Sequence, residues 1–298
     1  MKRLGVFILL FMQASQILSQ QRPEKKQRFM DEIQQLFAAE QGVFALAYKN
    51  LSTGDTLYWN ERELFHAAST MKTPVMIEVY RQAALGNCKL ADTMVIRKEF
   101  QSIVDGSWYT LEGVDDSDDE VYAKIGTPQS LQYLIERMIT RSSNIATNML
   151  MSRVTGVQIT ATMRKLGAPD ILVRRGVEDN KAYQQGLNNV TNAHDLMVLF
   201  EQLALGNAVS PEASSAMVQI LKRQFYNDLI PALLPKDVQV AHKTGWITGV
   251  HHDAGIIYLP DGRQYVLVLL SKKCKNEASA VQLLAMISSK IYNYFINN

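Results

Sequence analysis

Ser69 and Lys72 are the residues of this chain whose types and spacing most directly suggest chemistry. Residues three positions apart are neighbours on a helix, so the amine of Lys72 can reach the Ser69 hydroxyl. Serine is a weak nucleophile unless a base takes its proton, and lysine serves as a base only where burial or a nearby positive charge lowers its pKa. The same spacing is also compatible with a helix N-terminus that carries a solvated lysine, so the pair needs support from the rest of the sequence.

Two downstream motifs supply that support. Ser142-Ser143-Asn144 and Lys243-Thr244-Gly245 follow in the order in which Ser-x-x-Lys, Ser-Asp-Asn and Lys-Thr-Gly occur in class A β-lactamases and penicillin-binding proteins. From about Arg22 to the C-terminus the chain resembles the class A β-lactamase-like serine hydrolases. It is most similar to the β-lactamase-related branch with Ile-Val-Asp-Gly-Ser, here residues 103–107, and Arg-Gly-Val-Glu-Asp, here residues 175–179.

The resemblance implies which residues would carry out acylation. Ser69 would attack a carbonyl carbon and form an acyl-enzyme. The backbone N–H groups of Ser69 and Trp246 would stabilise the oxyanion that this attack creates. Lys72 would be the base for acylation, alone or in a relay, and Ser142 would pass a proton toward the leaving nitrogen.

The other matched residues would bind the substrate. Lys243 would hold the Ser142 hydroxyl and attract a substrate carboxylate, to which Thr244 would hydrogen-bond. Asn144 would orient the catalytic lysine and the substrate amide, and Gly245 completes the same binding element. Helix capping is the alternative interpretation for the serine and the asparagine. An exposed strand end is the alternative for the Lys-Thr-Gly motif.

The sequence departs from the family pattern in two places. Ser143 replaces the usual acidic residue of Ser-Asp-Asn, which we expect to affect local hydrogen bonds more than chemistry. Class A β-lactamases place the glutamate that activates the deacylating water just before a Leu-Asn pair. Glu178 is the candidate here, but Leu187-Asn188 lies nine residues later. A surface ion pair with Arg175 is the alternative role for this glutamate.

Two adjacent histidines, His251 and His252, follow the Lys-Thr-Gly motif closely enough to reach the same site. Successive residues of a strand point to opposite faces, so at most one of these side chains can line the pocket.

The elements that must position these residues come from both chain ends and from the middle. Apolar patterning predicts an α+β fold of the β-lactamase type, with an antiparallel sheet of about five strands built from both ends, flanked by terminal helices and a central all-helical region. The predicted strands are residues 43–50, 56–60, 238–242, 253–259 and 264–272, and the terminal helices are residues 24–39 and 278–295.

Capping signals divide the central region. Thr127-Pro128 predicts the start of a helix that runs to residue 140, and Ser210-Pro211 predicts the start of another. Gly156 is expected to follow the end of a helix over residues 144–154. The acidic run at residues 115–120 lacks the loop glycine and ligand spacing of a calcium motif, so a solvated loop is expected there.

The first 20 residues have the pattern of a secretory signal peptide. Lys2-Arg3 precedes the apolar run Leu4–Met12, which is too short to span a bilayer, and the more polar stretch Gln13–Gln20 follows. The alternative is an amphipathic helix that the mature protein retains. With cleavage, residues 21–298 form one serine hydrolase domain that is periplasmic or secreted, with no membrane association.

Charge and cysteine usage limit the expected partners. The 298-residue chain has 31 Lys and Arg against 29 Asp and Glu, and removal of Lys2 and Arg3 balances the two. Nothing in this balance favours nucleic acid or an anionic membrane. A monomer acting on a small-molecule β-lactam or a peptide-like acyl substrate is expected, with no metal and no cofactor. Whether Cys88 and Cys274 pair stays open at this point.

Several functions fit the three motifs. The first is a β-lactamase, a secreted serine hydrolase that opens β-lactam rings through an acyl-enzyme. A cell-wall D-Ala-D-Ala peptidase or an esterase on the same scaffold retains every motif. A penicillin-sensing domain would acylate and then stall. The rate of deacylation distinguishes these functions, and the sequence does not specify that rate.

Overall fold

The computed structural model describes residues 24–297, so the predicted signal peptide at residues 1–20 lies outside the described part. The chain divides into two units, residues 1–41 and 42–298. In the first unit, residues 24–39 form the predicted helix. Over residues 24–297, no helix combines the length and the apolar character needed to cross a membrane.

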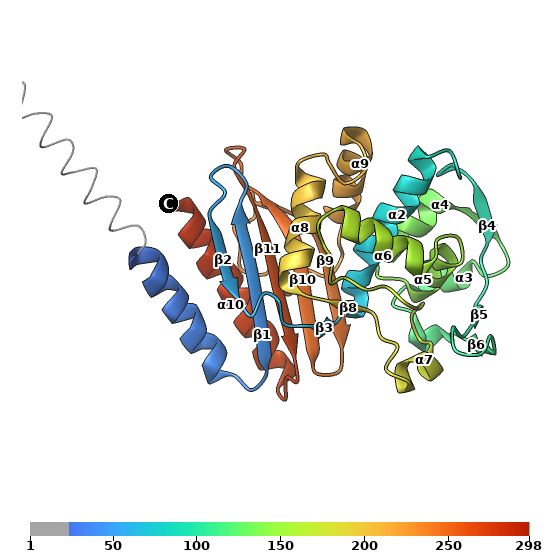
Figure 1. The fold of residues 1–298 in the computed structure, drawn as a ribbon, viewed down its shortest axis with the longest axis horizontal. Coiled ribbons are helices and arrows are strands. Elements are labelled where there is room, and N and C mark those ends of the chain that lie inside the picture. Colours follow the sequence, from blue (N-terminus) through green and yellow to red (C-terminus); the bar gives the residue numbers. More distant parts are fainter. Residues whose placement is uncertain (1–23, 298) are drawn as a thin grey trace, which may run out of the picture. The chain divides into compact units, whose positions relative to one another are not determined.

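The second unit contains an antiparallel sheet whose strands follow the order β2, β1, β11, β10, β9 (Figure 1). The two N-terminal strands and the three C-terminal strands meet where β1 pairs with β11, as the sequence predicts. β9 is an edge strand on the side of the helical region (Figure 1). The strands are β1 (Val43–Asn50), β2 (Thr56–Trp59), β9 (Gln239–Ile247), β10 (Val250–Tyr258) and β11 (Gln264–Lys272).

Strand β11 is buried on both faces, which explains its unbroken apolar sequence. Val266 and Val268 belong to the same core cluster as Leu199 of helix α8 (Ala193–Ala204). Tyr265 instead stacks against Phe295 of helix α10 (Glu277–Ile296), with ring centroids 4.7 Å apart. The two helices therefore cover opposite faces of the sheet (Figure 1).

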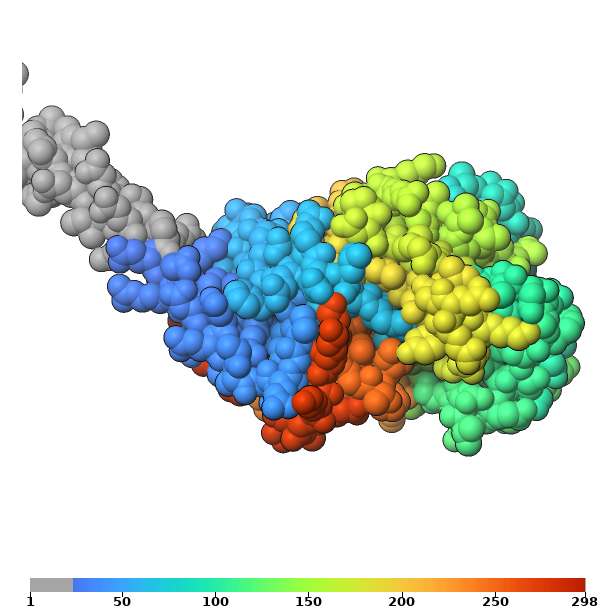
Figure 2. Space-filling model, turned by 60° about the horizontal axis from the view of Figure 1, so that its bottom comes forward, coloured from blue at the N-terminus to red at the C-terminus, as the bar shows by residue number. Residues whose placement is uncertain are grey.

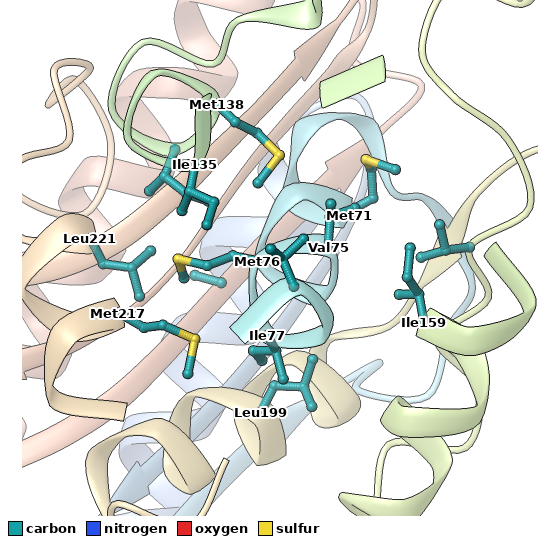
Figure 3. Close-up of a cluster of buried hydrophobic side chains, with 14 of the residues drawn as sticks. Met71, Val75, Met76, Ile77, Ile135, Met138, Ile159, Leu199, Met217 and Leu221 are labelled. Carbon is teal, nitrogen blue, oxygen red and sulfur yellow. The ribbon is translucent and has the colours of Figure 1, made fainter. Parts of the chain in front are cut away.

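Helix α2 (Lys72–Ala84) occupies the centre of the helical region. Figure 3 shows Val75, Met76 and Ile77 of this helix surrounded by apolar side chains from four other helices. These helices are α4 (Leu131–Thr140), α6 (Gly156–Lys165), α8 and α9 (Pro211–Leu221). Because the helix is enclosed on all sides, the position of its first residue, Lys72, is fixed by packing.

Cys88 and Cys274 are both buried and form no disulfide with each other.

Short elements connect these layers. The short strand pairs are β3 (Phe65–His66) with β8 (Val190–Thr191), β4 (Thr93–Val95) with β7 (Pro128–Ser130), and β5 (Glu99–Gln101) with β6 (Trp108–Thr110). The short helices are η1 (Ala68–Met71), η2 (Gly113–Asp115), α3 (Asp119–Ala123), α5 (Asn144–Met151) and α7 (Asn180–Gln184).

The predicted helix start at Thr127-Pro128 is wrong by three residues. Pro128 opens strand β7 and pairs with Val95, a place where its missing N–H is tolerated. Helix α4 begins at Leu131 because Ser130 is its N-cap. The Ser130 hydroxyl accepts a hydrogen bond from the Tyr133 N–H at 3.1 Å.

The predicted role of Gly156 as the residue after a helix is also wrong. Helix α5 already ends at Met151, and Gly156 is the first residue of α6, behind a capping box made by Thr155 and Gln158. A Cβ atom at Gly156 would lie 2.5 Å from the carbonyl oxygen of Val173. The glycine is therefore required by a close backbone approach and not by a helix end.

Candidate active site

Ser69 lies in η1, directly before the buried helix α2, and its side chain is partly exposed. The preceding residue, Ala68, has a φ of +44°, a left-handed conformation that a non-glycine residue adopts only under constraint. Strand β9 passes close beside this turn. A Cβ atom at Gly245 would lie 3.1 Å from the backbone nitrogens of both Ser69 and Thr70, so glycine permits this approach.

Lys72 is fully buried, so the alternative of a solvated lysine is wrong. Its Nζ atom donates to the Ser142 carbonyl oxygen at 2.5 Å, to the Ser142 hydroxyl at 3.1 Å and to Asn144 Oδ1 at 2.9 Å. Over residues 24–297, the structure contains no hydrogen bond between Lys72 and the Ser69 hydroxyl. Burial lowers the Lys72 pKa to about 7, although the charges of Asp116 and Glu178 oppose the shift.

The Ser142 hydroxyl lies between two lysines. Its Oγ atom is 3.1 Å from Lys72 Nζ and 3.2 Å from Lys243 Nζ. Ser142 itself has a φ of +61°, and the N-cap of helix α5 is the next residue, Ser143. The helix-capping alternative therefore does not apply to Ser142. Asn144 is the first residue of that helix, and its amide group contacts Lys72 instead of capping the helix.

Lys243 is also fully buried and lies in the middle of β9, not at a strand end as predicted. The strand extends five residues beyond the predicted end because it pairs with β10 as far as Ile247. Burial, together with the charge of Lys72, holds the Lys243 pKa well below its usual range, while Asp253 opposes the shift. Lys243 Nζ also donates to the Thr244 carbonyl oxygen at 2.8 Å.

A pocket of about 600 Å³ opens in front of these groups. It brings together Ser69, Ser142, Glu178 and all the substrate-binding candidates except Lys243, which lies buried behind Ser142. The residues that line it are Ser69, Val114, Asp115, Asp116, Ser117, Ser142, Asn144, Glu178, Tyr226, Asp228, Leu229, Thr244, Gly245, Trp246, Ile247 and His251.

Glu178 reaches this pocket from the loop that precedes α7. It has a φ of +59°, and its side chain is exposed to the solvent of the cleft. Partial desolvation raises the Glu178 pKa, and the charge of Asp115 adds to the shift, while Arg175 and Lys72 oppose it. In Figure 2 this loop (yellow) lies against the segment around residue 105 (green). Lys181 of the following helix α7 donates a hydrogen bond to that segment, with 2.9 Å between Lys181 Nζ and Asp105 Oδ2.

The alternative of an ion pair between Glu178 and Arg175 is wrong. Within the described chain, Arg175 is nearly buried and donates to the carbonyl oxygen of Gly176 and to Asn188 Oδ1 at 3.1 Å. Asn188, from the Leu-Asn pair, thus contacts the arginine and does not line the pocket with Glu178. The Leu-Asn pair is therefore separated from Glu178 in the structure as well as in the sequence.

Asn148 is a positioning residue that the sequence analysis missed. Its amide group accepts from the Val177 N–H at 2.7 Å and donates to the Val177 carbonyl oxygen at 3.0 Å, which fixes the backbone next to Glu178. A Cβ atom at Gly176 would lie 2.4 Å from Asn148 Oδ1, so glycine is needed there. Its place one helical turn after Asn144 is a signal that could have identified it.

The acidic run at residues 115–120 is not a solvated loop throughout. Asp116 and Asp118 are buried. Asp118 forms a bidentate pair with Arg137, with 2.6 Å between Arg137 Nε and Asp118 Oδ2. The Asp115 carbonyl oxygen accepts from Asn144 Nδ2 at 2.6 Å, which turns the Asn144 amide oxygen toward the lysine. Long-range partners, which local composition does not reveal, explain the difference.

Of the remaining sequence candidates, two line the pocket and one does not. Trp246 lines the pocket beside Gly245 with a largely exposed ring. His251 also lines it, whereas His252 is fully buried, with its Nε2 atom 2.9 Å from the His66 carbonyl oxygen. Among residues 24–297, no cluster of His, Cys, Asp and Glu is suited to hold a metal ion.

Comparisons with known proteins place this geometry in context. The sequence model of the β-lactamase enzyme family matches residues 28–295. A β-lactamase of Bacillus licheniformis is 24% identical over 288 residues, which cover 93% of this chain and 85% of that protein. A β-lactamase of Streptomyces albus G is 26% identical over 252 residues, or 81% of this chain and 75% of the relative.

Solved structures have the same fold. PBP-A superposes with a TM-score of 0.78 at 26% identity, covering 91% of this chain and 97% of PBP-A. A mutant of PBP-A in an acyl-enzyme complex with penicillin G gives the same values. The TLA-1 extended-spectrum β-lactamase superposes with a TM-score of 0.78 at 17% identity, over 91% of this chain and 99% of that one.

Proposed function

Because this chain belongs to the β-lactamase enzyme family and is a β-lactamase-like serine hydrolase, we propose that it is secreted and hydrolyses β-lactams through an acyl-enzyme on Ser69. The single observation that supports the proposal most is the position of the Ser142 hydroxyl. This hydroxyl lies within hydrogen-bond distance of both Lys72 and Lys243, and Ser142 and Ser69 line the same pocket.

The first half of the reaction acylates Ser69. Neutral Lys72 takes the hydroxyl proton as the Ser69 oxygen bonds to the lactam carbonyl carbon. The N–H groups of Ser69 and Trp246 hold the resulting oxyanion. When the ring C–N bond breaks, Ser142 gives its proton to the leaving nitrogen and is resupplied by the protonated lysine to which it is bonded. Lys243 and Thr244 hold the substrate carboxylate throughout.

The second half releases the acyl group. Glu178 takes a proton from a water molecule, whose oxygen attacks the ester carbonyl carbon, and this proton is then passed to the Ser69 oxygen as its bond to that carbon breaks. The raised pKa of Glu178 makes it a stronger base than an ordinary surface carboxylate. Its exposure to the cleft gives water access to the carboxylate.

A D-Ala-D-Ala peptidase or esterase is the second candidate, supported by the displaced Leu-Asn pair. Comparing the turnover of penicillin G, a peptide ending in D-Ala-D-Ala and a simple ester tests the proposal. We expect penicillin G to have the highest kcat/KM by at least about tenfold, a difference near 1.4 kcal/mol. Preferred turnover of the peptide or the ester, or a penicillin adduct that never deacylates, would contradict it.

The Lys72 pKa predicts a pH dependence for acylation. Only the neutral amine accepts the Ser69 proton, so acylation should slow about tenfold for each pH unit below about 7 and level off above it. Single-turnover acylation by penicillin G from pH 5 to pH 8.5 measures this limb separately from deacylation. A rate that stays constant across that range would show that Lys72 is not the base.

Replacing Lys243 should distinguish a role in binding the substrate carboxylate from a general loss of acylation. Lys243→Ala removes a donor to the substrate carboxylate in a desolvated site, where a hydrogen bond to a charged group is worth roughly 1.5–3 kcal/mol. We expect acylation by penicillin G to fall about 10- to 100-fold more than acylation by a neutral ester. Equal losses for the two substrates would exclude a role for Lys243 as the carboxylate anchor.

A further inference from the structure

Asp116 borders the pocket and contacts the segment that carries Ser142 and Asn144. Its Oδ2 atom accepts from the Ser143 hydroxyl at 3.0 Å and from the Ile145 N–H at 2.6 Å. Its Oδ1 atom accepts from the Asp118 N–H at 2.9 Å. The side chain is only 8% exposed. One oxygen of this carboxylate is therefore engaged with the start of α5 and the other with its own loop.

The partner of Asp116 is the residue at which the motif departs from the family pattern. Where the pattern places an acid, this chain has Ser143, a residue without charge. The Ser143 hydroxyl caps α5 by accepting from the Ala146 N–H at 3.1 Å, and it donates its own proton to Asp116. The negative charge is thus at the other end of the same hydrogen bond, 27 residues earlier in the chain.

We infer that Asp116 is a positioning residue that supplies the charge missing at Ser143, holds the turn at Ser142 in place and acts on Lys72 through that charge. The inference rests on the proposed function in that it treats Lys72 as the base for acylation. The constrained φ of Ser142 is consistent with it, because such a backbone conformation persists only where surrounding contacts enforce it.

The electrostatic surroundings of Lys72 fix the sign of the expected effect. Asp116 and Glu178 raise the Lys72 pKa against the effect of burial, and the charge of Lys72 in turn lowers the pKa of the nearby Lys243. Burial raises the pKa of Asp116, while the bond from the Ile145 N–H and the charge of Lys72 favour its ionised form. Removing the Asp116 charge should therefore lower the Lys72 pKa and move the acid limb of acylation to lower pH.

Asp116→Asn is the main test because it retains the shape of the side chain and removes its charge. Losing an opposite charge at close range should shift the Lys72 titration and the acid limb downward by on the order of one pH unit. The limb is read from single-turnover labelling by penicillin G. The titration is read from the NMR signal of the Lys72 side chain in lysine-labelled protein, with Lys72→Arg to assign it.

Asp118→Asn is the matched control. It removes a second buried carboxylate from the same segment, but one that pairs with Arg137. It should destabilise the fold without shifting the Lys72 titration. If the two variants shift that titration equally, or if Asp116→Asn shifts neither the titration nor the acid limb, the inference is wrong.

Exchanging the two residues provides a rescue. Asp116→Ser alone should lower the Lys72 pKa measured by NMR. Addition of Ser143→Asp should return that pKa to within a few tenths of a pH unit of the parent. Aspartate is as good an N-cap as serine, so the start of α5 can accept it. Failure of a folded exchange variant to recover would contradict the inference. The NMR titration needs no substrate, so it still tests Asp116 if the parent forms no adduct with penicillin G and the proposed function fails.

Discussion

Ser69→Ala should abolish both covalent labelling and hydrolysis of β-lactams. The substitution removes the only atom that forms the acyl bond in the proposed mechanism, and loss of the nucleophile in a serine hydrolase lowers kcat on the order of 10⁶-fold. The Ser69 side chain is partly exposed, so the free energy of unfolding should change by less than about 0.5 kcal/mol. Mass spectrometry and a hydrolysis assay, with urea unfolding, measure the three quantities.

Ser117→Ala is the control for this experiment. Ser117 lines the same pocket and its hydroxyl donates to the Arg141 carbonyl oxygen at 2.7 Å. This variant should still form the adduct. If the Ser69 variant retained hydrolysis at the parent rate, the assignment of the nucleophile would be wrong.

Glu178→Gln should slow deacylation about 100- to 10,000-fold and leave acylation nearly unchanged, because only the second half of the reaction needs this base. Mixed with excess penicillin G, the variant should give a burst of product equal to the enzyme concentration, followed by a persistent acyl-enzyme. Stopped-flow absorbance with intact-mass measurements follows both phases.

Asp228→Asn removes another carboxylate from the pocket and separates the role of Glu178 from general charge effects. It should turn over without a stall. If Glu178→Gln turned over as fast as the parent, Glu178 would be a structural residue. A different group would then activate the water, in keeping with the displaced Leu-Asn pair.

The sequence predicted the sheet for a physical reason, and the candidate site residues came from a family resemblance. A strand buried on both faces, such as β11, needs a continuous apolar run, and this is visible without a structure. Three motifs in one order likewise indicated that Ser69, Ser142 and Lys243 would meet. The structure brings Lys72 to Ser142, 70 residues away, and Lys243 to the same hydroxyl, 101 residues away.

The sequence could not predict contacts that depend on packing. Helical spacing suggested that Lys72 would contact Ser69, but the enclosed position of α2 directs its amine to Ser142 and Asn144. The burial of Asp116 likewise depends on distant partners, so the acidic run could not be distinguished from a solvated loop. Ser130 and Pro128 show the same limit locally, because both are good helix-start signals and strand pairing decided between them.

Peptide-level mass spectrometry of the parent protein during turnover of penicillin G tests the central claim most directly. Ring opening by a nucleophile adds the whole drug without loss of atoms. Acid quenching within seconds should therefore yield the peptide that contains Ser69 with a mass increase equal to that of penicillin G. The adduct should disappear as hydrolysed drug accumulates. Hydrolysis with no adduct on that peptide, or an adduct on a different residue, would contradict the account.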